Sequence, residues 1–249
     1  MTDYIYGLRA IIEAIDAGKE VDKIFIKKDI NGDTAQRLIK LARANEVPVQ
    51  RVPVEKLNKF TRKNHQGVVA LRAEVHYYKL QQVVPALYEE GVLPFVVVLD
   101  SITDVRNFGA IGRTAECCGV NAIVIPDRHS VGVGADAVKT SSGALLTLPV
   151  CREHSLAGAV RYLKESGYTV IGVTEKSSVN YTTLDYTGPV ALVMGAEDTG
   201  ISEDVLALCD GRAAIPMFGQ IGSLNVSVAA GVVMYEVVRQ RLAADAEII

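Results

Sequence analysis

Apolar residues recur with two different periods along this chain, and the two periods predict alternating strands and helices. In residues 4–75, short apolar runs near 23–26, 47–49 and 67–73 predict strands. Helical spacing predicts helices from Gly7 to Gly18, from a cap at Thr34 onward, and over 54–60. Strands that alternate with helices indicate an α/β layer arrangement.

A second α/β run follows a connector at 76–79. Phe95–Leu99 is a run of five apolar residues, which is typical of a parallel strand buried on both faces. Further strands are expected at 122–125, 169–173, 190–194 and 213–215. Helices are expected at 80–90, 110–118, 135–140, 156–165, 203–208 and 225–241. The chain is therefore predicted to be α/β, with a parallel sheet in its second part.

The 249 residues are enough for one large domain or two of ordinary size, and 49% hydrophobic residues fit a sizeable core. No apolar run approaches the ~20 residues of a membrane span. The first residues lack the basic and apolar segments of a signal peptide. Because the four cysteines show no C-x-x-C spacing, we expect reduced thiols in or near the core of a cytoplasmic protein. The four histidines show no ligand spacing, so no metal is expected, and the lack of a spanning apolar run predicts no membrane contact.

The net charge of −3 averages two unlike parts. Residues 1–75 hold 14 Lys+Arg and 10 Asp+Glu, whereas the remaining residues hold 12 and 19. The first part is the better candidate for contacts with RNA phosphates. The excess of four positive charges is modest, and an ordinary solvent-exposed basic surface is the simpler explanation of it.

Polar residues follow the strand expected at 95–99. Asn107, Arg113 and Glu116 fall on the entry and first turns of the next helix. An N-cap with ordinary surface charges would explain them. However, the sequence around Arg113 is too apolar for a casually solvated charge, which favours a functional role.

A glycine-bearing turn from Gly195 to Gly200, with Glu197 inside it, follows the strand expected at 190–194. Ligands of open α/β sheets bind where strands end in such turns, and glycine lets the backbone approach a ligand. The segment matches neither the dinucleotide-binding fingerprint nor the Walker loop. Taken alone, an ordinary strand–helix turn explains it equally well.

A Pro/Gly-rich loop places Ser223, Leu224 and Asn225 directly before the last helix. Ser and Asn side chains at that position can accept hydrogen bonds from the free N–H groups of the first turn. A well-capped helix would explain this cluster alone. Three such clusters in one half of the chain favour a cofactor site.

The segments N-F-G-A-I-G-R-T-A-E, V-M-G-A-E-D-T-G and I-P-M-F-G-Q-I-G-S-L-N-V-S-V-A resemble the three signature motifs of the SpoU/TrmH-type ribose 2'-O-methyltransferases of the SPOUT superfamily. Residues 6–10 and 65–70 resemble the L30e-like substrate-binding domain of its large-subunit rRNA guanosine members. The resemblance covers nearly the whole chain. It departs from the family pattern at Asp198-Thr199 and at Gly112.

The resemblance implies transfer of a methyl group from S-adenosylmethionine to a ribose 2'-hydroxyl, at a guanosine of large-subunit ribosomal RNA, and a trefoil knot in the last third of the chain. It implies cofactor contacts from Gly195, Ile215, Leu224, Ser223 and Asn225. It implies a reaction centre made of Arg113, Asn107, Glu197, Asn225 and Ser223. Because a guanidinium stays charged and donates in a fixed fork, Arg113 is expected to stabilise the developing oxyanion. Glu197 is expected either to orient its neighbours or to act as the base.

We therefore expect an L30e-like RNA-binding domain over 1–75, a linker over 76–80 and a knotted methyltransferase domain over 81–249. The expected partners are structured RNA and a second copy of the chain. Two alternatives within RNA biology are a tRNA or antibiotic-resistance rRNA ribose methyltransferase, and an assembly factor that has kept the fold without the catalysis. A third alternative is a nucleotide-binding α/β enzyme unrelated to RNA.

Overall fold

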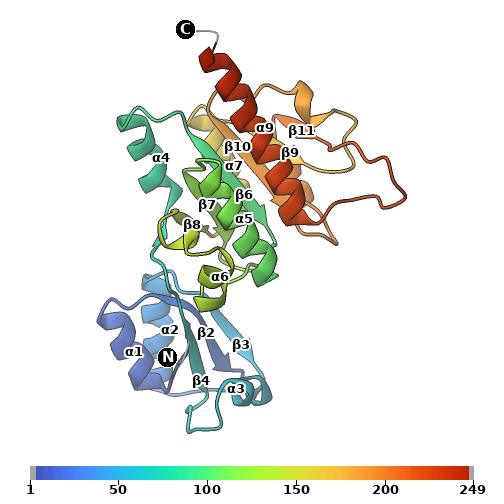
Figure 1. The fold of residues 1–249 in the computed structure, drawn as a ribbon. Coiled ribbons are helices and arrows are strands. Elements are labelled where there is room, and N and C mark those ends of the chain that lie inside the picture. The colour runs from blue at the N-terminus through green and yellow to red at the C-terminus, as the bar shows by residue number, and fades with distance from the viewer. Residues whose placement is uncertain (1–3, 247–249) are drawn as a thin grey trace. The chain divides into compact units, whose positions relative to one another are not determined.

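A computed structural model describes residues 4–246, and the contacts within it divide the chain into two compact units (Figure 1). The first unit runs through His76 and includes Gly132–Asp136. The second contains Tyr77–Val131 and the chain from Ala137 onward. No helix among the described residues is long and apolar enough to cross a membrane. The domain limits expected at 75 and 81 stay predictions.

The first unit is a four-stranded sheet in the order β1-β4-β2-β3. β2 and β3 pair in parallel, and the other neighbours are antiparallel. Its strands are β1 (Tyr4–Tyr6), β2 (Val21–Lys27), β3 (Val49–Val52) and β4 (Val68–Arg72). Its helices are α1 (Leu8–Asp16), α2 (Asp33–Ala44) and α3 (Val54–Phe60).

Successive side chains of β2 point to opposite faces of the sheet, and both faces are buried. Ile24 and Ile26 belong to the core with α1 and α2, whereas Phe25 belongs to a second cluster with Leu57 of α3. The prediction of a cap at Thr34 was wrong, because Gly32 precedes α2 and no side chain caps it.

The second unit holds a seven-stranded sheet in the order β11-β9-β10-β6-β7-β8-β5, and all its neighbouring strands are parallel, as predicted. The strands are β5 (Tyr77–Tyr78), β6 (Phe95–Asp100), β7 (Ala122–Pro126), β8 (Val150–Glu153), β9 (Thr169–Val173), β10 (Val190–Gly195) and β11 (Gly211–Ala213). The remaining helices of the chain are α4 (Leu80–Glu89), α5 (Val105–Cys117), α6 (Ala135–Thr140), α7 (Leu156–Glu165), α8 (Glu203–Leu206) and α9 (Val226–Ala246). Two short 3-10 turns are η1 (Ala144–Leu146) and η2 (Tyr181–Thr183).

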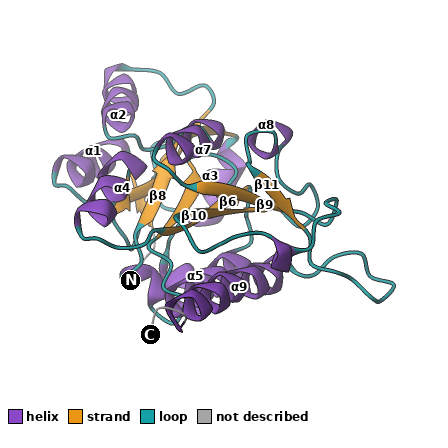
Figure 2. Cartoon of the chain, turned by 90° about the horizontal axis from the view of Figure 1, so that it is seen from above, coloured by secondary structure: helices purple, strands orange, loops and turns teal. Residues whose placement is uncertain are grey.

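Helices cover both faces of this parallel sheet. α5 and α9 pack side by side on one face (Figure 2). α4, α7 and α8 share a core with the other face. A Cβ on Gly112 would lie 2.8 Å from the side chain of Leu145, so a glycine lets α5 approach η1 closely. This packing accounts for the small residue where the family pattern has a larger one.

Several elements differ from the sequence-based expectation. β8 was missed because its four residues include Arg152 and Glu153, which are nevertheless buried. β5 was missed because it has only two residues. β11 ends at Ala213, so Ile215 lies in the loop beyond it. The knot implied by the resemblance stays a prediction.

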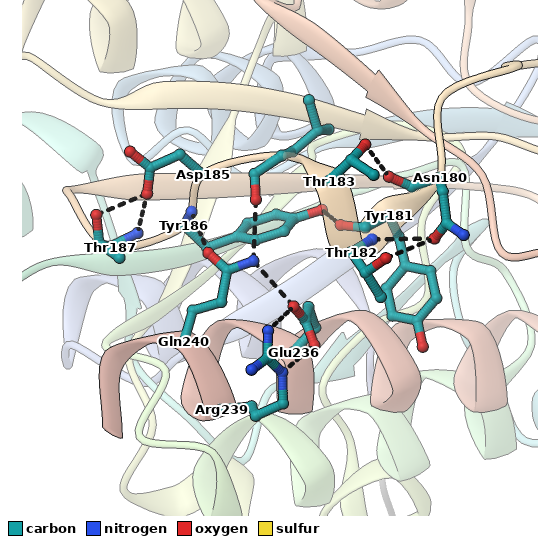
Figure 3. Close-up of polar contacts among 11 residues, drawn as sticks. Asn180, Tyr181, Thr182, Thr183, Asp185, Tyr186, Thr187, Glu236, Arg239 and Gln240 are labelled. Atoms are coloured by element: carbon teal, nitrogen blue, oxygen red, sulfur yellow. Dashed lines mark hydrogen bonds and ion pairs between the residues drawn. The ribbon is translucent and has the colours of Figure 1, made fainter. Parts of the chain in front are cut away.

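A polar clamp fixes the second half of α9 to the loop at residues 180–187 (Figure 3). Gln240 Nε2 donates to the backbone oxygen of Leu184 (2.9 Å), and Gln240 Oε1 accepts from the backbone nitrogen of Tyr186 (3.0 Å). Glu236 is buried, and its carboxylate accepts two hydrogen bonds from Arg239 (2.7 and 2.8 Å). These contacts hold α9 in place, and its first turn lies at the site described next.

Candidate active site

The strand order places the carboxyl ends of β6 and β10 side by side. The two strands are in register, with Gly195 opposite Asp100. β7 and β8 extend the sheet on one side of β6, and the chain then returns to the other side as β9. Such a reversal of strand order is where open α/β sheets bind ligands.

Asn107 lies in the first turn of α5, shortly after β6. Asp104 caps this helix, because its Oδ1 accepts hydrogen bonds from the backbone nitrogens of Arg106 (2.8 Å) and Asn107 (3.0 Å). These two hydrogen bonds hold the pKa of Asp104 below its ordinary value, and the bond from Asn107 has the larger effect. The cap starts α5 five residues before the predicted position. It leaves the side-chain amide of Asn107 free to reach the turn after β10.

Glu197 belongs to a tight turn that folds back on the end of β10. The backbone nitrogen of Gly200 donates to the oxygen of Ala196 (2.8 Å), and the reverse bond measures 3.2 Å. A Cβ on Gly195 would lie 2.1 Å from the backbone carbon of Gly200. Only glycine therefore fits at position 195.

Hydrogen bonds join Asn107, Glu197 and Asn225 into a ring. Glu197 Oε1 accepts from Asn107 Nδ2 (3.2 Å), from Asn225 Nδ2 and from the backbone nitrogen of Val226 (3.3 Å). Asn225 Nδ2 also donates to Asn107 Oδ1 (3.0 Å). We call this arrangement the Asn–Glu–Asn ring. It brings together three residues that come from α5, the turn after β10 and the start of α9.

Asn225 is also the N-cap of α9. Its Oδ1 accepts hydrogen bonds from the backbone nitrogens of Ser227 (3.0 Å) and Val228 (3.4 Å), as its position before the helix predicted. This cap fixes the amide so that its nitrogen faces Glu197. The carboxylate of Glu197 accepts a hydrogen bond from the backbone nitrogen of Val226 and so lies at the amino end of α9, where the helix dipole is positive.

A pocket opens at the carboxyl ends of β9 and β10. Of the residues that the sequence proposed for the site, it is lined by Gly195, Glu197, Ile215, Ser223 and Leu224. The structure thus gathers most of the expected cofactor contacts into one cavity.

The lining of the pocket carries two carboxylates, Glu175 and Glu197, and no Lys, Arg or His. Most of its other walls are apolar or small, namely Val173, Met194, Ala196, Met217, Leu224, Val226 and Ala229. An apolar body with a net positive charge fits such a cavity, because nearby carboxylates stabilise a cation. A nucleoside polyphosphate does not fit, because no cation of the lining would balance its charge.

Arg113 is not placed as its sequence context predicted. It is exposed on α5, and its side chain forms no hydrogen bond or ion pair with any residue of the described range 4–246. The apolar neighbours Phe108 and Ile111 are fully buried because they form the inward face of the helix. The apolar context therefore belongs to the other side of α5, and the catalytic role of Arg113 stays a prediction.

Sequence reasoning missed the residues that follow β9. Val173, the last residue of β9, lines the pocket with Thr174 and Glu175 after it. Glu175 is the second residue after its strand, as Glu197 is after β10. The rule that ligands bind at the carboxyl ends of parallel strands would have found them. Within residues 4–246, no group of three His, Cys, Asp or Glu side chains could hold a metal ion.

Comparison with known proteins defines the class as S-adenosylmethionine-dependent RNA 2'-O-methyltransferases with a SPOUT fold. Residues 94–235 match the model described as SpoU rRNA Methylase family, so the chain belongs to that family. Residues 4–78 match the model described as RNA 2'-O ribose methyltransferase substrate binding. The resemblance of the sequence motifs is thereby confirmed.

Relatives match this chain over nearly their whole length. The Bacillus subtilis protein named "Putative TrmH family tRNA/rRNA methyltransferase YacO" is 37% identical over 96% of each chain. The crystal structure of the SpoU methyltransferase AviRb from Streptomyces viridochromogenes, in complex with AdoMet, matches with a TM-score of 0.60 and 26% identity over 96% of this chain and 90% of that chain. An AdoMet-bound rRNA methyltransferase from Sinorhizobium meliloti matches equally well, with a TM-score of 0.60 and 26% identity over 95% and 86% of the two chains.

Proposed function

We propose that this protein methylates the ribose 2'-hydroxyl of one nucleotide in structured RNA, a guanosine of large-subunit ribosomal RNA, in the bacterial cytoplasm. The observation that carries the proposal is the Asn–Glu–Asn ring beside a pocket that has carboxylates and no cations. S-adenosylmethionine carries a sulfonium and an apolar adenine, so its charge and shape fit this lining. When bound, it supplies a methyl group that is already activated for transfer.

The chain then has two tasks, because a ribose hydroxyl is a weak nucleophile at neutral pH. It must align the hydroxyl oxygen with the methyl carbon, and it must lower the cost of the alkoxide charge. Glu197 Oε1 receives three hydrogen bonds, whereas Oε2 accepts none from the described residues. Oε2 is thus free to take the hydroxyl proton or to orient the ribose, while Asn107 and Asn225 hold the carboxylate in position.

Arg113 is proposed to stabilise the oxyanion. It is exposed and its side chain has no partner among residues 4–246, so its guanidinium is available to RNA. Arg113→Ala should lower kcat at least 100-fold, on the order of the loss of one oxyanion donor, and leave cofactor affinity nearly unchanged. Radiolabelled methyl transfer and calorimetric titration with S-adenosylmethionine measure the two quantities. Unchanged turnover would remove Arg113 from the reaction.

A homodimer is proposed to bring a partner's surface to this site. Val228, Tyr235 and Leu242 are more than half exposed and recur every seven residues along α9. Such a spacing aligns them on one face of the helix, where a second copy would bury them. Sedimentation equilibrium of the wild-type chain and of Tyr235→Glu measures the association.

The first unit is proposed to recruit the RNA. Lys56, Lys59, Arg62 and Lys63 are exposed on α3 and the loop after it, and we call them the α3 basic cluster. Clustered cations of this kind attract RNA phosphates. Replacing Lys59, Arg62 and Lys63 with alanine should weaken RNA binding and flatten its salt dependence, whereas Lys40→Ala on α2 should not. Equal affinity in both variants would argue against recruitment by this surface.

Mapping ribose methylation on RNA from cells with and without the gene tests the substrate. A single site in large-subunit rRNA that loses its methyl group supports the proposal, and a site in tRNA supports the alternative substrate. No detectable binding of S-adenosylmethionine in a calorimetric titration would favour the assembly factor.

A further inference from the structure

The loop between β11 and α9, residues 214–225, projects from the second unit (Figure 1). It contains no charged residue. Phe218 is 97% exposed and Ile221 is 75% exposed, so its most accessible side chains are apolar. Full exposure of a phenylalanine ring to water is unfavourable, and exposed apolar side chains that lie close together mark interaction sites.

This loop also forms one wall of the candidate active site. Met217, directly before Phe218, lines the pocket, and so do Gly222, Ser223 and Leu224. Phe218 therefore lies in the chain between Met217 and Gly222, which both line the cavity in which methyl transfer is proposed.

We infer that Phe218 is a stacking platform for a base of the RNA beside the ribose that is methylated. This inference rests on the proposed function. A ribose can enter a pocket only when its nucleotide leaves the regular helix, and single-stranded bases are held by stacking on aromatic side chains. The loop has no Lys or Arg, so it lacks the groups that hold phosphates, whereas it has an aromatic face and the amide of Gln220 for a base.

The first experiment compares Phe218→Leu and Phe218→Tyr in methyl transfer at limiting RNA. The substrate is total RNA from cells that lack the gene, which contains both rRNA and tRNA without this modification. Leucine keeps the apolar character and removes the aromatic face, so kcat/KM for RNA should fall on the order of 10-fold to 100-fold. Tyrosine should retain nearly full activity. Affinity for S-adenosylmethionine and the slope of RNA binding against salt should not change in either variant.

The second experiment uses the absence of tryptophan from this chain. Phe218→Trp creates a single indole, whose fluorescence should be quenched when the RNA is added. Leu93→Trp is the matched control, because Leu93 is 44% exposed at the amino end of β6, away from the pocket. Its fluorescence should respond little to RNA.

Four results would overturn the inference. An unchanged kcat/KM for RNA in Phe218→Leu would remove the ring from substrate binding. A weaker affinity for S-adenosylmethionine would mean that the ring covers the cofactor instead. A lower sedimentation mass would assign Phe218 to contacts between copies of the chain. A wild-type chain that methylates no RNA would refute the proposed function itself, and the inference with it.

Discussion

The carboxylate of Asp100 holds both polar hydrogens of Ser202, a residue 102 positions later in the chain. Asp100 Oδ2 accepts hydrogen bonds from the backbone nitrogen (2.8 Å) and from Oγ (2.6 Å) of Ser202. Asp100 ends β6 and is buried, and Ser202 closes the turn that carries Glu197. The pair therefore ties the Glu197 turn to the neighbouring strand.

Loss of this tie should slow methyl transfer. Hydrogen bonds to a carboxylate contribute about 1.5–3 kcal/mol each, and those to a neutral amide oxygen contribute less, so Asp100→Asn should loosen the turn and displace Glu197. We expect kcat to fall at least 10-fold, since small displacements of catalytic groups are costly, with little change in KM for RNA. Ser202→Ala should show a smaller loss of kcat, because its backbone hydrogen bond remains.

Ser101→Ala is the control for this pair. Ser101 Oγ also donates to the carboxylate of Asp100 (3.0 Å), but among the described residues its side chain forms no hydrogen bond with the turn. Steady-state kinetics of the three variants measure the effect. An equal loss of kcat in Ser101→Ala and Ser202→Ala would show that Asp100 acts through the general stability of β6 and not through the turn.

Gly195→Ala should disrupt the cofactor pocket. The added methyl group would overlap the backbone of Gly200 and Ile201, and backbone cannot yield as a side chain can. Affinity for S-adenosylmethionine should fall about 10-fold or more, measured by calorimetry. Gly188→Ala, where no atom lies within 4 Å of the added carbon, should bind normally. Normal binding by both variants would contradict the close approach at Gly195.

The clamp on α9 should make the stability of the protein sensitive to acid. Hydrogen bonds from Arg239, with a smaller contribution from Gln240, lower the pKa of the buried Glu236 carboxyl below its ordinary value of 4.5. The ionised form therefore stabilises the folded state, and this contribution is complete above the ordinary pKa of 4.5. This contribution is lost as the pH falls through the depressed pKa of the folded state.

Glu236→Gln tests this dependence. Because Arg239 is largely exposed, we expect the variant to lose about 1 kcal/mol of unfolding free energy at pH 7 and to approach the wild type below pH 4. Urea unfolding at a series of pH values measures the difference. Glu165→Gln, an exposed residue at the end of α7, should follow the wild type throughout. A constant difference between Glu236→Gln and the wild type at every pH would refute the titration of Glu236.

The cysteines should differ sharply in reactivity. Burial raises the pKa of Cys118 and Cys209 to about 11 and that of Cys151 to about 12, so their thiolates are scarce at neutral pH. Cys117 is exposed, and the expectation that all four thiols lie in or near the core was wrong for it. Iodoacetamide at pH 8 should add one label to the folded chain, at Cys117, and four after unfolding. Intact mass and peptide mapping would detect any other pattern.

The sequence by itself determined the elements that local chemistry controls. The apolar run at 95–99 and the helical spacing at 156–165 are both present as predicted, because burial on two faces and on one face impose different periods. The cap at Asn225 was also predictable, because a helix start leaves N–H groups that a nearby amide oxygen satisfies. The sequence motifs further identified the family, and the comparisons confirm it.

Only the tertiary structure decided which of the polar residues meet. The ring of Asn107, Glu197 and Asn225, and the bond from Ser202 to Asp100, join positions that lie 28 to 118 residues apart. Those contacts exist because β10 inserts beside β6, and strand order is not encoded in any local pattern. The exposure of Arg113 was misjudged for a related reason. Residues next to Arg113 in sequence, such as Ile111, lie on the other face of the helix, so their apolar character does not bury the charge.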